Sequence, residues 1–143
     1  MPLILDANQM SNCLNKTPES IPIIIALSSR KVTIVFGGTK ILAEYSRNHL
    51  FLALVNELFK AGVARKLDDN LVNQQERVFI QTGAILSDDP HILAVAFVGK
   101  SRLLFTEDQA LMHDFKSKSM LDKPRGRIYN LADSAKLLKR LGR

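Results

Sequence analysis

The stretch KVTIVFGGTKILAEY, residues 31–45, contains a strand signal, a turn signal and the start of a helix. Its β-branched and apolar run stops at Gly37-Gly38, which is typical of a buried strand followed by a turn. Thr39 can cap the helix that follows, in which apolar residues recur at helical spacing as far as Gly62. A strand that leads directly into a long helix is the repeating unit of a parallel α/β sheet.

Other short apolar runs have the length of buried strands. They are LIL (Leu3–Leu5), GAIL (Gly83–Leu86) and RLLF (Arg102–Phe105). Helices are expected over Pro18–Arg30, Leu71–Gln81, Pro90–Lys100 and Thr106–Phe115. Residues 127–143 predict a short strand and an amphipathic helix, whose inward-facing residues are Ala135, Leu137, Leu138 and Leu141. This alternation predicts a parallel sheet covered by helices on both faces.

The composition excludes several classes of protein. With 143 residues and 46% hydrophobic content, the chain has the length and apolar content of one ordinary domain. No segment approaches the roughly 20 apolar residues that span a bilayer. The N-terminus lacks the basic region of a secretory signal. Cys13 is the only cysteine, so no internal disulfide can form, and a reducing cytoplasm is the expected compartment.

The formal charge of +6 is unevenly distributed. Residues 116–143 contain nine Lys/Arg and two Asp, whereas residues 1–115 contain eleven Lys/Arg against twelve acids. We therefore expect a single domain over 1–143 with a basic C-terminal extension from about residue 116. Such a segment is typical of nucleic-acid binding, and equally of a solvated helix face. The candidate nucleic-acid contacts are Lys116, Lys118, Lys123, Arg125 and Arg127.

Acidic residues follow three of the expected strands. Asp6 follows the first, Asp88 and Asp89 follow GAIL, and Asp108 lies three residues after Phe105. Ligands of open α/β sheets bind beyond the carboxyl ends of the strands, so we expect these acids to converge there. Glu44, in the helix after the second strand, can join them. Clustered carboxylates need protons or cations to neutralise them, and oxygen ligands suit Mg²⁺ or Mn²⁺.

Each acid also has a structural interpretation. Asp6 and Asp89 precede helices and can serve as N-caps, and Asp108 favours a helix N-terminus through the macrodipole. Glu44 is different, because it lies inside a helix among apolar neighbours where no cap is needed. Taken singly the acids fit either interpretation, and their convergence favours a metal site.

Four motifs in order resemble those of PIN-domain nucleases: LILDAN, TKILAEY, SDDPHILAVA and LLFTEDQAL, between Leu3 and Phe115. The resemblance implies a three-layer α/β/α sandwich with a central, mainly parallel sheet, and a metal-dependent ribonuclease. The catalytic metal ligands that it implies are Asp6, Glu44, Asp89 and Asp108, with Asp88 as a second candidate beside Asp89. Asn8 and Thr106 match the small polar positions that support the first and fourth acids.

The leading hypothesis is a Mg²⁺- or Mn²⁺-dependent endoribonuclease, of which one form is the toxin of a toxin–antitoxin pair. RNA, an antitoxin protein and a second copy of the chain are then the candidate partners. The alternatives are a phosphoacceptor receiver-like signalling domain and a catalytically silent PIN-like module that binds RNA or protein. The three histidines are expected to be structural or exposed, and helical geometry predicts that His91 points away from Asp89.

Overall fold

The computed structural model describes residues 1–132, 134, 136 and 138. These residues contain one sheet in which every pair of neighbouring strands is parallel, in the order β3-β2-β1-β4-β5. Its strands are β1 (Pro2–Leu5), β2 (Thr33–Phe36), β3 (Ala64–Lys66), β4 (Leu103–Phe105) and β5 (Arg127–Ile128). The predicted parallel sheet is confirmed, and β1 lies at its centre.

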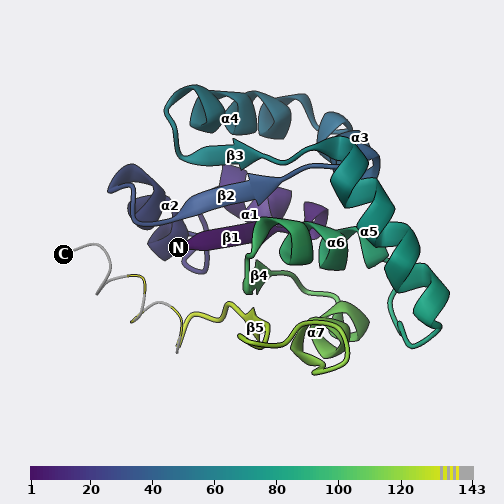
Figure 1. Cartoon of the computed structure of the whole chain (residues 1–143). Helices are drawn as coiled ribbons and strands as arrows, with labels where there is room; N and C mark the ends of the chain where they lie inside the picture. The colour runs from purple at the N-terminus through teal and green to yellow at the C-terminus, as the bar shows by residue number, and fades with distance from the viewer. Residues whose placement is uncertain (133, 135, 137, 139–143) are drawn as a thin grey trace.

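Helices cover both faces of this sheet, which gives the three layers that were expected (Figure 1). α5 and α6 lie in front of the strands in that view, and α1 and α2 lie behind them. The helices are the 3-10 helix η1 (Ala7–Gln9), α1 (Met10–Leu14), α2 (Ile21–Ser28), α3 (Thr39–Ser46), α4 (His49–Lys60), α5 (Asp69–Thr82), α6 (Pro90–Gly99) and α7 (Gln109–Lys116). Within the described part of the chain, no helix is long and apolar enough to cross a membrane.

The turn after β2 needs glycine for steric reasons. Gly38 has a φ of +90°, and a Cβ at this position would lie 2.6 Å from Cγ1 of Val72. Its N–H donates to Oδ1 of Asp69 at 2.9 Å, a bond that lowers the pKa of this carboxyl group. Gly38, and not Thr39, is therefore the N-cap of α3. This turn sets the direction of the helix that carries Glu44.

The helix expected from Lys40 to Gly62 is in fact two helices. The chain leaves the helical conformation at Asn48, whose side chain caps α4 by accepting a bond from the N–H of Phe51 at 3.1 Å. The second helix is followed by β3, which was not predicted, because its sequence Ala-Arg-Lys contains no apolar run. Strand β3 is short and lies at the edge of the sheet, where charged side chains are tolerated.

The strand predicted at Gly83–Leu86 is wrong. These residues have no regular structure and form a loop that leads into α6. The strand predicted near the C-terminus is present as β5. In the amphipathic helix predicted after it, Leu138 is buried and Lys136 is exposed, while Ala135, Leu137 and Leu141 lie outside the described residues.

Candidate metal site at the carboxyl edge of the sheet

Asp6 lies directly after β1 and is buried. The Thr106 hydroxyl, which follows β4, donates to Oδ2 of Asp6 at 2.6 Å. Burial raises the pKa of Asp6, and this hydrogen bond opposes the increase. The same hydroxyl oxygen accepts from the Asn8 side chain at 3.3 Å and from the Asp108 N–H at 3.1 Å. Thr106 thus joins the ends of two neighbouring strands around the Asp6 carboxylate.

Glu44 is brought to the same edge by the residue beside it. The hydroxyl of Tyr45 donates to the carbonyl oxygen of Leu5, the last residue of β1, at 2.5 Å. The Tyr45 ring is fully buried and packs edge-on against Phe51, with ring centroids 4.9 Å apart. Burial raises the pKa of Tyr45, so its hydroxyl remains a proton donor. α3 is fixed to the end of β1 in this way, and the charge of Glu44 contributes to the raised pKa of Asp6.

Asp89 experiences the charges of the other three acids. Its pKa is raised to about 6, first by burial and then by Asp6, Glu44 and Asp108, while His91 lowers it. Charges influence a carboxyl group in this way only over short distances. The charges of Asp6, Glu44 and Asp108 thus act on Asp89, and of these three acids only Glu44 lies in one close group with it among the described residues.

The loop that carries Asp89 is held in place by a buried acid of α7. The Asp114 carboxylate accepts from the N–H of Leu86 at 3.0 Å and from the N–H of Ser87 at 2.9 Å. Asp114 is only 1% exposed. Asp88 lies in the same loop but is exposed to solvent. The loop therefore directs Asp89, and not its neighbour, into the cluster.

Capping explains only one of the acids. Asp6 and Asp89 precede η1 and α6, but neither side chain makes a capping hydrogen bond. Asp108 does cap α7, because its Oδ1 accepts from the N–H of Leu111 at 3.1 Å. Capping therefore accounts for Asp108 and does not account for Asp6 or Asp89.

His91 belongs to the cluster, and the prediction that it points away from Asp89 is wrong. Among the described residues, one ligand atom each of Glu44, Asp89 and His91 lies within 4.8 Å of the others, a grouping that can hold a metal ion. Asp6 and Asp108 are not in this group. Asp89 precedes the helix with φ −121° and ψ 51°, so the helical rotation of 100° per residue does not apply between it and His91. Sequence reasoning missed His91 for this reason.

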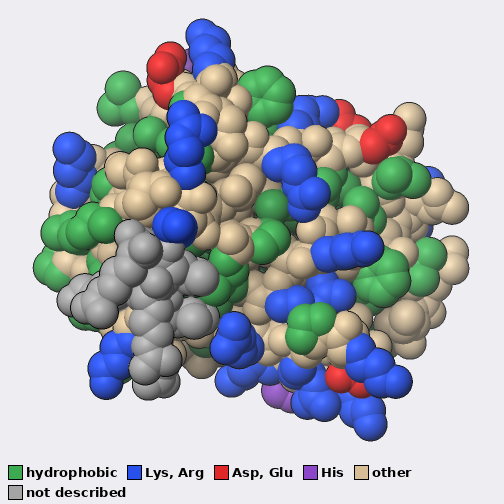
Figure 2. Space-filling model, turned by 60° about the vertical axis from the view of Figure 1, so that its left-hand side comes forward, with side chains coloured by type: hydrophobic (Ala, Val, Ile, Leu, Met, Phe, Trp, Pro, Cys, Tyr) green, Lys and Arg blue, Asp and Glu red, His purple; other side chains and the backbone are tan. Residues whose placement is uncertain are grey.

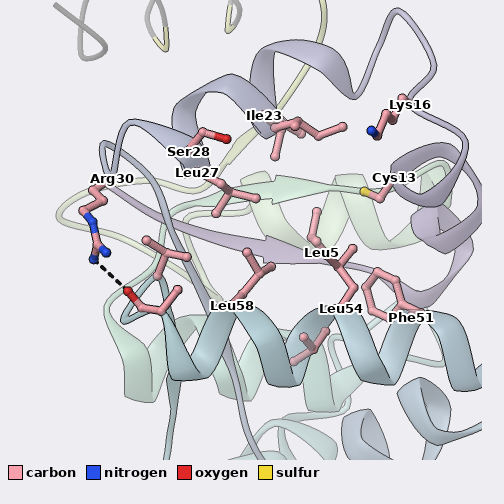
Figure 3. Close-up of a pocket in the computed structure, with 14 residues that line it drawn as sticks. Leu5, Cys13, Lys16, Ile23, Leu27, Ser28, Arg30, Phe51, Leu54 and Leu58 are labelled. Carbon is pink, nitrogen blue, oxygen red and sulfur yellow. Dashed lines mark hydrogen bonds between the residues drawn. The ribbon is translucent and has the colours of Figure 1, made fainter.

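An apolar cleft lies between α2 and α4, away from the acids (Figure 3). Its volume is about 330 Å³, and its walls are formed mainly by aliphatic side chains such as Ile23, Leu27 and Leu58. Lys16 lies at one end and Arg30 at the other, where the guanidinium donates to the carbonyl oxygen of Ala61 at 2.7 Å. The described residues that line the cleft include no acid.

The candidate nucleic-acid contacts all lie on the surface. The side chains of Lys116, Lys118, Lys123, Arg125 and Arg127 are exposed. Figure 2 shows a face with many Lys and Arg side chains and few acidic ones, and the basic side chains gather at the lower edge, level with α7 and β5 in Figure 1. The positive charge predicted for this segment is therefore accessible to a polyanion.

Among solved structures, the chain is similar to a chain in the crystal structure of VapBC2 from Rickettsia felis bound to a DNA fragment from their promoter. The two are 19% identical, the match covers 91% of this chain and 98% of that chain, and the TM-score is 0.49. Comparison of the sequence with protein-family models and with curated proteins found no match. Function is therefore inferred from the side chains of the site.

Proposed function

We propose that this chain is a single-domain PIN-family endoribonuclease that depends on Mg²⁺ or Mn²⁺. The observation that carries the proposal is the close grouping of Glu44 and Asp89 with His91 at the edge where Asp6 is buried. Burial first, and then the charges of Asp6, Glu44 and Asp108, raise the pKa of Asp89 to about 6. Such a cluster is unfavourable without a cation. The grouping of Glu44 and Asp89 with His91 supplies donors of the kind that a divalent cation takes.

The four acids, with Asp88 as an exposed second candidate, would act as ligands, and Asn8 and Thr106 would support them. A bound divalent ion would polarise the phosphodiester and lower the pKa of a water molecule that attacks it. The residues of this chain fix the geometry for this chemistry: Thr106 orients Asp6, Tyr45 positions Glu44, and Asp114 holds the loop of Asp89. The exposed Lys and Arg side chains after residue 115 would contact the RNA backbone, which carries one negative charge per phosphate.

The test is cleavage of RNA by the purified chain with Mn²⁺, with Mg²⁺ and with a chelator. Cleavage should require the ion and fall about 1000-fold in Asp6→Asn and in Asp89→Asn, because a catalytic ion contributes several kcal/mol to transition-state stabilisation. Glu57→Gln, which removes an exposed carboxylate on α4, is the control and should retain activity within about twofold, since a single exposed charge contributes little. Cleavage retained by both site variants would contradict the proposal.

We further propose that the nuclease is a toxin and that the cleft between α2 and α4 binds a segment of its antitoxin. The cleft is apolar, with the basic side chains of Lys16 and Arg30 at its two ends and no acid among its described lining residues. A segment with aliphatic side chains flanked by acids would complement it. The candidate antitoxin is the protein encoded beside this gene.

Co-purification with that protein tests the partner. Leu58→Asp places a charge inside the cleft and should abolish the complex, whereas Leu71→Asp, on the exposed face of α5, should leave it intact. The partner should also relieve the growth arrest that the chain causes when it is produced alone. Equal binding by both variants would exclude the cleft as the docking site.

A further inference from the structure

The acidic edge, which is the carboxyl edge of the sheet with Asp6, Glu44, Asp89 and Asp108, also contains a buried nitrogen donor. The proposed set of four acidic ligands does not include it. The imidazole of His91 is the second residue of α6 and has a side-chain exposure of 6%. Among the described residues, its Nδ1 makes no hydrogen bond, and its Nε2 has only a close contact with a carboxylate oxygen of Glu44. Leaving a buried polar group without a partner costs about 1–3 kcal/mol, so such groups usually have a functional explanation.

The surroundings of His91 indicate what the missing partner is. Its Nε2 contacts a carboxylate oxygen of Glu44, an ion pair that exists only when the ring is protonated. One ligand atom from each of Glu44, Asp89 and His91 falls within 4.8 Å of the others. A neutral imidazole has one nitrogen lone pair, and this lone pair and an oxygen of each carboxylate can bind one ion within the group. A cation satisfies all of them at once.

We propose that His91 is a metal ligand and that Glu44, Asp89 and His91 form a mixed nitrogen and oxygen site that prefers Mn²⁺, or a later first-row divalent ion, over Mg²⁺. Imidazole is a ligand of transition metals, whereas Mg²⁺ prefers oxygen ligands and retains its waters. The inference rests on the proposed function, because it assigns the ion of the same site. It goes further in choosing between the two ions and in adding a ligand from outside the four acids.

A purely structural role for His91 gives a different expectation. A protonated His91 that only paired with Glu44 would position that carboxylate and would be repelled by any incoming cation. Its replacement would then change the affinities for Mn²⁺ and Mg²⁺ by the same factor. Direct ligation changes mainly the affinity for the transition metal, so the ratio of the two affinities separates the two roles.

The experiment uses the full chain freed of metal by a chelator. Calorimetric titration gives the affinities for Mn²⁺ and for Mg²⁺, and pulsed electron paramagnetic resonance of the Mn²⁺ complex reads any coupling to a ¹⁴N ligand. The variants are His91→Gln, which replaces nitrogen by oxygen at similar reach, and His113→Gln, which makes the same change at a histidine whose side chain is 68% exposed.

The wild type and His113→Gln should bind Mn²⁺ more tightly than Mg²⁺ and show the ¹⁴N coupling. His91→Gln should lose the coupling and bind Mn²⁺ about 10- to 100-fold more weakly, at least the loss that outer-shell substitutions cause. Its Mg²⁺ affinity should change by less than about threefold. The nitrogen coupling is measured on the wild type, so this result holds even if His91→Gln does not fold.

Mn²⁺ binding without ¹⁴N coupling would overturn the inference and leave the proposed nuclease intact. Equal weakening for both ions in His91→Gln would do the same and assign His91 a positioning role. Failure of the wild type to bind either ion would overturn both proposals.

Discussion

Two neighbouring residues, Leu5 and Asp6, belong to regions in which burial has opposite effects on the stability of the fold. Leu5 lines the apolar cleft between α2 and α4, and Asp6 lies in the acidic edge. The cleft is walled by side chains whose burial stabilises the fold. In the acidic edge, burial and like charges raise the pKa values of Asp6 and Asp89, so their ionised forms are unfavourable. The end of β1 thus contributes to stability through Leu5, on the side of the cleft, and to the candidate metal site through Asp6, on the side of the acids.

The largest expected effect is on the cleft side. Phe51 is fully buried, so Phe51→Ala should lower the free energy of unfolding by about 3–5 kcal/mol. Leu54 lines the cleft and is only partly buried, so Leu54→Ala should cost about 1 kcal/mol. Urea unfolding of both variants measures the difference. Equal losses of unfolding free energy in the two variants would mean that Leu54 is as buried as Phe51 and that the cleft is closed in solution. The contrast between the cleft and the acidic edge would then fail.

A smaller loss is expected from Asp114, a buried acid of α7 whose role is structural. Asp114→Ala should lower the free energy of unfolding by about 3 kcal/mol, because it leaves the N–H groups of Leu86 and Ser87 without acceptors. The matched control is Asp122→Ala, which breaks only a surface ion pair with Arg125 at 3.6 Å and should change stability by less than about 1 kcal/mol. Thermal unfolding of the two variants decides whether the loop is anchored as described.

The smallest expected effect is a gain in stability, from the substitution of Asp89. The pKa of Asp89 is about 6 in the folded chain and about 4 in an unfolded one. Between these pH values the folded chain binds more protons, so the free energy of unfolding falls as pH rises through this window. Asp89→Asn cannot ionise, and in a chelator at pH 7 it should be more stable than the wild type by about 1 kcal/mol, after allowance for partial exposure of the carboxylate.

This gain should vanish below about pH 4, where Asp89 is protonated in both states. Asp88→Asn, which removes an exposed carboxylate from the same loop, is the control. Chemical unfolding at pH 4, 5.5 and 7 gives the three points required. A wild type that is as stable as Asp89→Asn at pH 7 would show that the acidic edge carries no electrostatic penalty.

The parts of the fold that could be predicted from the sequence are those with strong local signals. β1, β2 and β4 are apolar runs bounded by polar residues, and α6 has Pro90 at its start. Strand β3 gave no such signal, because an edge strand of three residues needs little apolar sequence. GAIL resembled a strand, but its backbone bonds to the side chain of Asp114, which lies 28 residues from Leu86 and leaves no local trace.

The same contrast applies to the candidate site. The positions of Asp6 and Asp108 could be predicted, because they follow β1 and β4 and parallel strands end at one edge. Asp89 was placed after a strand that does not form. The order of the strands, which decides which acids meet, could not be derived from local pattern. The direction of His91 was missed because it depends on the non-helical backbone of Asp89. Local sequence thus indicates where acids are placed, and tertiary contacts decide which side chains meet.

The hydrogen bond between Thr106 and Asp6 has a consequence for synthesis of the chain. It joins residues 100 positions apart, so it cannot form until about three quarters of the polypeptide has been translated. The acids that precede it are made early but remain unassembled during elongation. The acidic edge of the sheet therefore cannot be complete before Thr106 has been made.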